Sequence, residues 1–334
     1  MIYKIRLHVQ SLIKVYVALI FGSFFIIGAD FVNAQNIKKV AQSTPGGKVV
    51  GSWDLTVSTP NGSYPAWLEI EKSGLSTLVG RYVGQGGSAR PISEIILNLD
   101  EEYYHFSIPP QWSDRNNDLN FEFKVVNNKI KGWTTEHAGQ ILHFSGIRAP
   151  KLKSQKEPNW ASPIHLLKNS NLDGWHVIGG KNQWTVDNGI LKNRTSGGNL
   201  VTDKEFNDFK LHIEFKYPER SNSGIYLRGR YEVQVIDSFG EEPDSHLLGG
   251  IYGFLDPTVN AAKKAGKWQS YDITLVGRRV TVVLNGTNVI CDRNIPGITG
   301  GALDSNEGEA GPIMLQGDHG PIQYKNIVIT PMKD

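Results

Sequence analysis

The chain has 334 residues, a length that predicts two domains. Charged residues make up 20% and hydrophobic residues 39%, which is typical of a packed globular protein and too apolar for a disordered one. The net charge of +2 argues against nucleic acid as a partner, and the single cysteine, Cys291, excludes an internal disulfide and a thiolate zinc cluster.

Residues 1–34 have the composition of a secretory signal peptide. Three basic residues precede an uncharged apolar run, residues 15–28, and the small residue Ala34 lies at the expected cleavage site. The run is shorter than the ~20 residues that a spanning helix needs. We therefore expect a bacterial protein that is exported to the periplasm or the medium and is not stably inserted in the membrane after cleavage. An uncleaved membrane anchor is the alternative.

Residues 47–148 predict a small all-β domain of unassigned role. Short segments that alternate between apolar and polar residues are separated by turn residues, and Asn127-Asn128 suits a two-residue hairpin. No helical period persists for ten residues, so we expect a small barrel or sandwich. The expected strands are 52–58, 67–71, 78–83, 103–108, 120–126, 129–134 and 142–147.

Residues 149–163 contain three prolines and three lysines without an apolar period, and they predict a linker. A second β-rich domain follows over residues 164–334, and its Asn285-Gly286 pair predicts another hairpin. Its many short strands require two stacked sheets or a barrel. The strand-poor segment 239–268 is long enough to be functional, and we expect it to form a rim over a binding face. The expected strands are 184–186, 190–192, 209–215, 224–228, 231–237, 271–276, 280–284, 288–291, 313–316 and 324–329.

Two neighbouring strands of this domain carry polar side chains at alternate positions. Alternation places Tyr226 and Arg228 on one face, and Glu232 and Gln234 on one face of the next strand. An aromatic ring, a guanidinium, a carboxylate and an amide together suit a sugar site. A solvated face with an Arg228–Glu232 salt bridge is the alternative. Asp237 falls on the opposite face, so this strand supplies one carboxylate where a conventional glycosidase needs two.

The segment Gln316-Gly-Asp-His-Gly320 follows an apolar strand. It predicts that Asp318 and His319 lie at a strand end, where a carboxylate and an imidazole can form a general base and its orienting group. Two solvated side chains are the equal alternative, and His246 in the long loop is a weaker candidate. The chain has no Walker A loop and no G-x-G-x-x-G sequence opening a helix, so we expect no nucleotide cofactor.

The sequence does not decide whether the protein binds a divalent metal. Asp237, Glu241, Asp244 and Asp256 could ligate calcium through oxygen, although acidic residues in loops are more often simply solvated.

Motifs of the second domain occur in an order that resembles the 3-keto-disaccharide hydrolase family, also described as 3-keto-glucoside 1,2-lyase/3-keto-2-hydroxy-glucal hydratase domains. The resemblance covers roughly residues 164–332 and implies a concanavalin A-like jelly roll. The first domain lies outside it. The motifs are Leu172-Asp-Gly-Trp175, Trp184-Thr-Val-Asp-Asn-Gly-Ile190, Phe209-Lys-Leu-His-Ile-Glu-Phe215, Asn222-Ser-Gly-Ile225 with Arg228, Tyr231-Glu-Val-Gln-Val-Ile-Asp237, Ile251-Tyr-Gly253, Trp268-Gln-Ser-Tyr-Asp272, Val280-Thr-Val-Val-Leu-Asn-Gly286, Gly311-Pro-Ile-Met-Leu-Gln316 and Asp318-His-Gly320.

The resemblance implies an enzyme acting on 3-keto-glucosides or 3-keto-disaccharides. A ketone at C3 acidifies the C2 proton, so a base can remove it and the C1 substituent can leave; water addition then gives net hydrolysis. Such a site needs a base, a donor for the enolate and an acid for the leaving group. Glu232 or His319 is expected to act as the base, Asp318 to orient His319, and Arg228 to stabilise the enolate. The expected substrate-binding residues are Asn222, Tyr226, Gln234, Tyr252 and Asp237.

Two other functions remain open. The same type of fold hosts non-catalytic carbohydrate-binding proteins, and a conventional glycoside hydrolase would act on unoxidised sugars. The aglycone, the anomer, the balance between elimination and hydration, and the oligomeric state have no signal in the sequence.

Overall fold

The computed structural model describes residues 47–111, 116–135, 139–152, 158–168 and 171–333. The expected signal peptide and residues 153–157 of the expected linker lie outside the described residues. Pro45–Asp334 form one compact unit. In the described ranges every element of regular structure is a strand, and no helix has the length and apolar character to cross a membrane.

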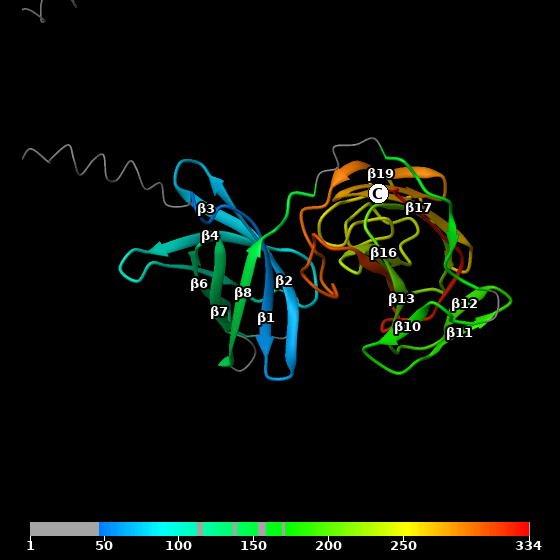
Figure 1. Cartoon of the computed structure of the whole chain (residues 1–334), viewed down its shortest axis with the longest axis horizontal. Coiled ribbons are helices and arrows are strands. Elements are labelled where there is room, and N and C mark those ends of the chain that lie inside the picture. Colours follow the sequence, from blue (N-terminus) through cyan, green and yellow to red (C-terminus); the bar gives the residue numbers. More distant parts are fainter. Residues whose placement is uncertain (1–46, 112–115, 136–138, 153–157, 169–170, 334) are drawn as a thin grey trace, which may run out of the picture. The chain divides into compact units, whose positions relative to one another are not determined.

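The first eight strands form a closed antiparallel barrel, drawn blue to green in Figure 1. Each strand pairs with the next, and β1 pairs with β8 to close the ring. Closure leaves no free sheet edge, which protects an antiparallel sheet from pairing with other chains. The strands are β1 (Gly51–Thr59), β2 (Gly62–Ser73), β3 (Thr77–Val83), β4 (Arg90–Asn98), β5 (Tyr103–Ile108), β6 (Leu119–Val126), β7 (Lys129–Thr135) and β8 (Ile141–Arg148).

Alternation along the strands fills the inside of the barrel with apolar side chains. Phe121 and Phe123 of β6 are buried in the barrel core, and Phe106 of β5 stacks on Phe121 with ring centroids 4.4 Å apart. The expected hairpin is confirmed, because Asn127 and Asn128 both have positive φ between β6 and β7. β4 was not among the expected strands, because a register shift in its pairing with β3 interrupts the alternation.

The second domain is a sandwich of two antiparallel sheets. The five-stranded sheet has the order β10-β13-β20-β15-β16, and the eight-stranded sheet has the order β11-β12-β21-β14-β17-β18-β19, with β9 paired to β21. The strands are β9 (Ile164–His165), β10 (Trp175–Ile178), β11 (Trp184–Asp187), β12 (Ile190–Asn193), β13 (Asn199–Phe206), β14 (Phe209–Lys216), β15 (Asn222–Leu227), β16 (Tyr231–Ile236), β17 (Gln269–Val276), β18 (Arg279–Leu284), β19 (Thr287–Asn294), β20 (Gly311–Leu315) and β21 (Ile322–Pro331).

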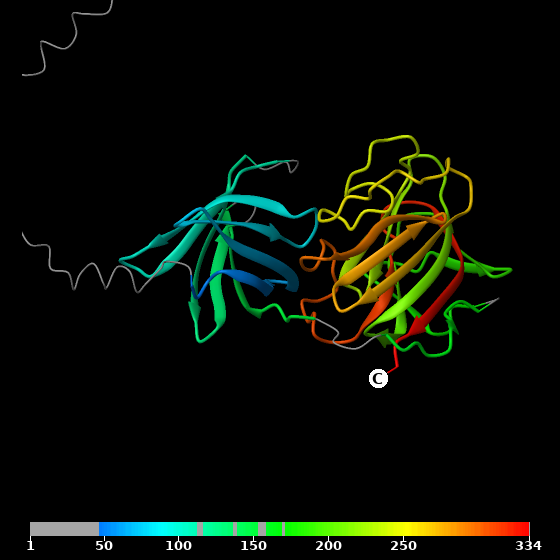
Figure 2. The same ribbon diagram turned by 90° about the horizontal axis from the view of Figure 1, so that it is seen from above.

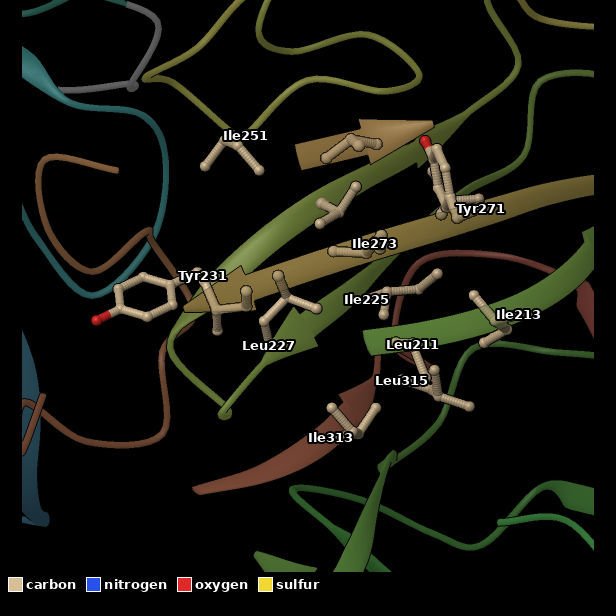
Figure 3. Close-up of a cluster of buried hydrophobic side chains, with 14 of the residues drawn as sticks. Leu211, Ile213, Ile225, Leu227, Tyr231, Ile251, Tyr271, Ile273, Ile313 and Leu315 are labelled. Carbon is tan, nitrogen blue, oxygen red and sulfur yellow. The ribbon is translucent and has the colours of Figure 1, made fainter. Parts of the chain in front are cut away.

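The two sheets of the sandwich share one apolar core. Figure 3 shows Leu211 and Ile213 of β14 facing Ile225 and Leu227 of β15, all of them buried. The hydroxyl of Tyr231 points away from this cluster (Figure 3). The all-β fold class, a jelly-roll sandwich preceded by a small barrel, is thereby confirmed.

Two features of the sandwich bear on the site. Residues 237–268, drawn green-yellow to orange in Figure 2, contain no strand, and their backbone pairs with β16 through Gly250 and Tyr252. The expected hairpin at Asn285-Gly286 is confirmed by positive φ at both residues.

Three strands of the sandwich, β9, β10 and β13, were not expected. β13 has a register shift between Val201 and Glu205 that breaks its apolar period.

Candidate active site

Three of the four polar side chains predicted from alternation, those of Tyr226, Glu232 and Gln234, lie on the face of the five-stranded sheet that is turned away from the sandwich core. Tyr226 of β15 is directly opposite Glu232 of β16, and Gly224 is opposite Gln234. Their neighbours Ile225 and Val233 pack in the core between the sheets. The expectation that Tyr226, Glu232 and Gln234 share one face is therefore confirmed.

Glu232 is a carboxyl group that is almost removed from solvent. The residue is 4% exposed. The pKa of Glu232 is raised to about 8, chiefly by burial and also by the negative charge of Asp318, against the hydrogen bond from Tyr226, which lowers it. The carboxyl group occupies the space above Gly224, where a Cβ atom would lie 2.2 Å from Glu232 Oε1. A carboxyl whose pKa lies near neutral pH suits proton transfer.

The hydroxyl of Tyr226 joins Glu232 to a backbone carbonyl. Tyr226 Oη lies 2.9 Å from Glu232 Oε2 and 2.9 Å from the oxygen of Gly300. The hydroxyl has one hydrogen, so it donates to the carboxylate when Glu232 is ionised. When Glu232 is protonated, its carboxyl can donate to Tyr226 Oη while the tyrosine donates to Gly300. Thr299 lies beside this pair, and its Oγ1 accepts the backbone N–H of Glu232 at 3.0 Å.

Tyr252 approaches the site from the long loop. Its backbone N–H donates to the backbone carbonyl oxygen of Glu232 at 3.1 Å, which extends the sheet beyond β16. Burial and, next, the charge of Glu232 raise the pKa of the Tyr252 hydroxyl, so it keeps its proton and can donate a hydrogen bond. His246 packs edge-to-face on the Tyr252 ring, with centroids 5.1 Å apart, and its Nδ1 lies 2.6 Å from Asp244 Oδ1. His246 therefore supports the Tyr252 ring.

Asp318 and His319 lie in the turn after β20. His319 Nδ1 is 2.7 Å from Asp318 Oδ1, the arrangement of a base and its orienting carboxylate. Asn193 holds this turn by donating to the carbonyl oxygens of Gly317 and Gly320, both at 3.0 Å. The negative charge of Asp318 acts on Glu232 and raises its pKa. The side chains of Asp318 and His319 are themselves about half exposed, as the alternative of two solvated side chains predicts.

Two side-chain amides complete the polar face. Gln316 hydrogen-bonds through its backbone N–H to Gly224, and Asn222 lies two residues before Gly224 on the same face of β15. Asn222 Oδ1 and Gln316 Oε1 are buried without a hydrogen-bond partner among the described residues. Gln316 was not among the expected site residues, although its position directly before the Gly-Asp-His turn could have indicated it.

Arg228 lies elsewhere, and the expectation that it shares a face with Tyr226 is wrong. β15 ends at Leu227, and Arg228 has φ of 53°, so the alternation stops before it. Its Nη2 donates to Tyr231 Oη at 3.1 Å and to the oxygen of Gly277 at 2.9 Å. The alternative of an Arg228–Glu232 salt bridge is not formed either, because Tyr226 takes that place beside the carboxylate.

Three of the four acidic residues considered for calcium have other partners for their side chains, and one of them, Asp244, is paired with His246. Asp237 Oδ2 accepts the N–H of Arg220 at 3.0 Å, and Asp256 Oδ1 accepts the N–H of Ser245 at 2.8 Å. Across the described ranges, no three His, Cys, Asp or Glu side chains converge in a way that could hold a metal ion. The structure therefore does not gather Asp237, Glu241, Asp244 and Asp256 into one ligand set.

A buried carboxyl, two tyrosines and two amides with unpartnered oxygens on one side of a β-sandwich form a candidate polar small-molecule site. The chain belongs to the family of 3-keto-alpha-glucoside-1,2-lyase-like domains, whose model matches residues 162–330. The resemblance predicted from the ordered motifs is thus confirmed.

Individual relatives were also found. A 3-keto-disaccharide hydrolase of Bacteroides thetaiotaomicron is 22% identical over 190 residues, which are 45% of this chain and 65% of the relative, so the match spans just under two thirds of that protein. A crystal structure of a proposed glycosyl hydrolase from Parabacteroides distasonis has 30% identity and a TM-score of 0.44, covering 58% of this chain and 98% of that one. A second proposed glycosyl hydrolase from the same organism has 26% identity and a TM-score of 0.40, covering 51% of this chain and 98% of its own.

Proposed function

We propose that this chain is an exported enzyme that cleaves 3-keto-glucosides by elimination. The base removes the proton at C2, the electrons form the C1–C2 double bond, and the C1–O bond breaks. The products are a 3-keto-2-hydroxy-glucal and the protonated aglycone, and addition of water to the glucal gives 3-keto-glucose. The observation that carries this proposal is the solvent-shielded carboxyl of Glu232, placed on a polar face of the sheet in a member of this family.

Glu232 is the residue that we assign as the base, because its high pKa matches proton removal near neutral pH. His319, oriented by Asp318, is the other candidate base and can instead protonate the leaving group. Tyr252 replaces Arg228 as the donor to the enolate oxygen, since burial raises the pKa of its hydroxyl and keeps it protonated, whereas the single hydrogen of Tyr226 is used by Glu232 or Gly300.

The amides bind the hydroxyl groups of the sugar. The side-chain oxygens of Asn222 and Gln316 are without partners among the described residues, and Gln234 lies on the same face. Asp237 is better explained as an acceptor that fixes the loop before β15 than as a substrate ligand.

One observation favours a second candidate, a glycosidase acting on unoxidised sugars. Asp318 lies near Glu232, so the site contains two carboxyl groups where the sequence of β16 alone supplied one. A conventional glycosidase requires such a pair on either side of the scissile bond.

The test is a product assay on the purified protein. A 3-keto-glucoside and its unoxidised counterpart are incubated side by side, with and without a chelator, and the released aglycone and glucal are quantified. Release from the keto sugar alone supports elimination, whereas cleavage of both sugars supports the glycosidase. Loss of product formation on chelation would indicate that a metal is required. No product from either sugar would support a carbohydrate-binding protein.

Glu232→Gln is the variant that tests the proposed base. It keeps the size of the side chain and removes the proton acceptor, so turnover is expected to fall by about 10²–10⁴-fold. Glu205→Gln on β13 is the matched control and should retain full turnover, because Glu205 is exposed. Full turnover in both Glu232→Gln and His319→Ala would contradict the assignment. N-terminal sequencing of the protein recovered from the host tests export, which predicts a chain that begins after Ala34.

A further inference from the structure

The segment of the barrel between β3 and β4, residues 84–89, contacts two stretches of the sandwich. The N–H of Gly301 donates to the oxygen of Gln85 at 2.9 Å. A Cβ atom on Gly300 would lie 2.3 Å from the oxygen of Gly87, and one on Gly253 would lie 2.5 Å from Ser88 Cβ. At both stretches the two segments are so close that a side chain at Gly300 or Gly253 would displace the barrel segment.

These two stretches hold the groups that surround Glu232. The carbonyl of Gly300 is the acceptor for the Tyr226 hydroxyl, and a Cβ on Gly301 would lie 2.5 Å from Tyr226 Oη. Thr299, the preceding residue, accepts the N–H of Glu232. On the other side, Gly253 directly follows Tyr252. The barrel segment therefore contacts the chain on both sides of the site, at or next to residues that bond to the backbone of Glu232 or to the Tyr226 hydroxyl.

Side chains anchor the barrel next to this segment. Trp67 of β2 is fully buried in the hydrophobic core of the sandwich, together with Val83 at the end of β3. The Trp67 ring meets Phe254 edge-to-face with centroids 5.4 Å apart, and the Arg81 guanidinium lies over both rings at 5.8 and 5.5 Å. Val83 immediately precedes the segment, so burial on the sandwich fixes its first end.

We propose that residues 84–89 of the barrel are a positioning element of the active site, which holds the Gly300 carbonyl against Tyr226 and the Tyr252 loop against Glu232. The barrel thereby sets the direction of the Tyr226 hydrogen bond and, through it, the proton affinity of Glu232. This inference rests on the proposed function for its catalytic consequence but not for its structural one. The family model matches residues 162–330, so the positioning element belongs to the part of the chain that precedes the match.

Ser88 is the position at which the proposal is tested. It is buried, and its Cβ faces Gly253. Ser88→Leu adds bulk at this contact, whereas Ser88→Ala keeps the Cβ and is the matched control. Gly86→Ala is a second control in the same segment, because a Cβ there would meet no atom within 4 Å.

The first measurement is the titration of the Glu232 carboxyl by carbon-13 NMR on glutamate-labelled protein, with the signal assigned by its loss in Glu232→Gln. Bulk at Ser88 pushes the segment away from the sandwich, including the neighbouring Gly87 that abuts Gly300. Displacement of Gly300 removes the acceptor that the Tyr226 hydroxyl uses when Glu232 is protonated, which favours the ionised form. Ser88→Leu should therefore lower the titration midpoint of Glu232, and both alanine variants should leave it unchanged. An unchanged midpoint in folded Ser88→Leu would overturn the proposal. If Ser88→Leu does not fold, Ser88→Val is judged by the same criteria.

The second measurement is steady-state turnover of a 3-keto-glucoside. Misplacement of the site should lower kcat in Ser88→Leu by about ten- to a hundredfold and change KM much less. A rise in KM with unchanged kcat would contradict a positioning role. If the wild-type protein has no activity on keto sugars, the proposed function fails, and the NMR titration alone still decides whether the barrel positions Glu232.

Discussion

Glu232 is the group on which the chemistry of this site depends, and its neighbours determine when it can act. Burial and the charge of Asp318 favour the protonated carboxyl, whereas the Tyr226 hydroxyl favours the carboxylate. The pKa of about 8 that results lies well above the value of 4.5 for a free glutamate. A base with this pKa is protonated in most molecules at neutral pH, so activity should depend strongly on pH.

The pH dependence of kcat/KM reveals the role of Glu232. If Glu232 is the base, kcat/KM should rise with pH by about tenfold per unit below the midpoint and level off above about 8. Asp318→Asn removes a negative charge that raises the pKa of Glu232, so the rising limb should move to lower pH. The profile is measured on a 3-keto-glucoside for both proteins. If kcat/KM instead falls as pH rises through about 8, Glu232 acts as the general acid.

The pairing of β15 with β16 creates the space in which this carboxyl lies. Gly224 is opposite Gln234 and beside Glu232, and no larger residue fits, since a Cβ would lie 2.2 Å from Glu232 Oε1. Gly224→Ala should therefore displace the carboxyl and lower kcat by about tenfold or more while the strand stays paired. Gly308→Ala is the control, because its Cβ would meet only Pro150 at 3.8 Å. Circular dichroism and kcat on a 3-keto-glucoside are measured together; normal kcat in Gly224→Ala would show that the carboxyl can relax.

Alternation along β15 and β16 was sufficient to predict which site residues share the outer face of these two strands. Tyr226, Glu232 and Gln234 share a face because the strands are regular there. The rule failed at Arg228, where positive φ ends the strand, and no residue type in that sequence indicates the change. It also failed for β4 and β13, whose register shifts break the two-residue period.

Contacts between distant parts of the chain had no local signal. Thr299 and Gly300 reach Glu232 and Tyr226 from more than sixty residues away in sequence, and they act through a hydroxyl and a backbone carbonyl that many residues could supply. The resemblance to a family could not indicate the barrel contacts, because it covers the second domain only. Those contacts required the structure.

A network of buried charges joins the barrel to the sandwich. Asp54 of β1 and Glu307 of the sandwich are both buried, and Glu307 Oε2 accepts hydrogen bonds from Arg278 Nε and, at 2.8 Å, from Tyr231 Oη. Arg278 also donates to the oxygen of Pro150 at 2.8 Å. Asp54 Oδ1 and Glu307 Oε1 have no donor among the described residues. One proton shared by the two carboxyls would supply the missing hydrogen bond, and the raised pKa of Asp54 agrees with such sharing.

That proton makes the stability of the whole molecule depend on pH. Burial, and next the charge of Glu307, raises the pKa of Asp54 from 3.8 to about 9, against the opposing charges of Arg278 and Arg230. Between these two values the folded chain keeps a proton that the unfolded chain has released. The free energy of unfolding should therefore fall as pH rises through this window, by up to about 1.4 kcal/mol per pH unit.

Asp54→Asn separates this effect from the rest of the protein. The amide keeps the shape of Asp54 and can donate to Glu307 without titrating, so the variant should be more stable than wild type at pH 8 and nearly equal to it at pH 4–5. Each kcal/mol should appear as roughly 2–4 °C in Tm. Thermal unfolding is measured from pH 5 to pH 9, with the exposed Asp118→Asn as the control. Glu232 has a raised pKa as well, so part of the wild-type slope should survive in Asp54→Asn and disappear only when Glu232→Gln is added. Equal slopes in wild type and Asp54→Asn would show that Asp54 does not hold the proton between the barrel and the sandwich.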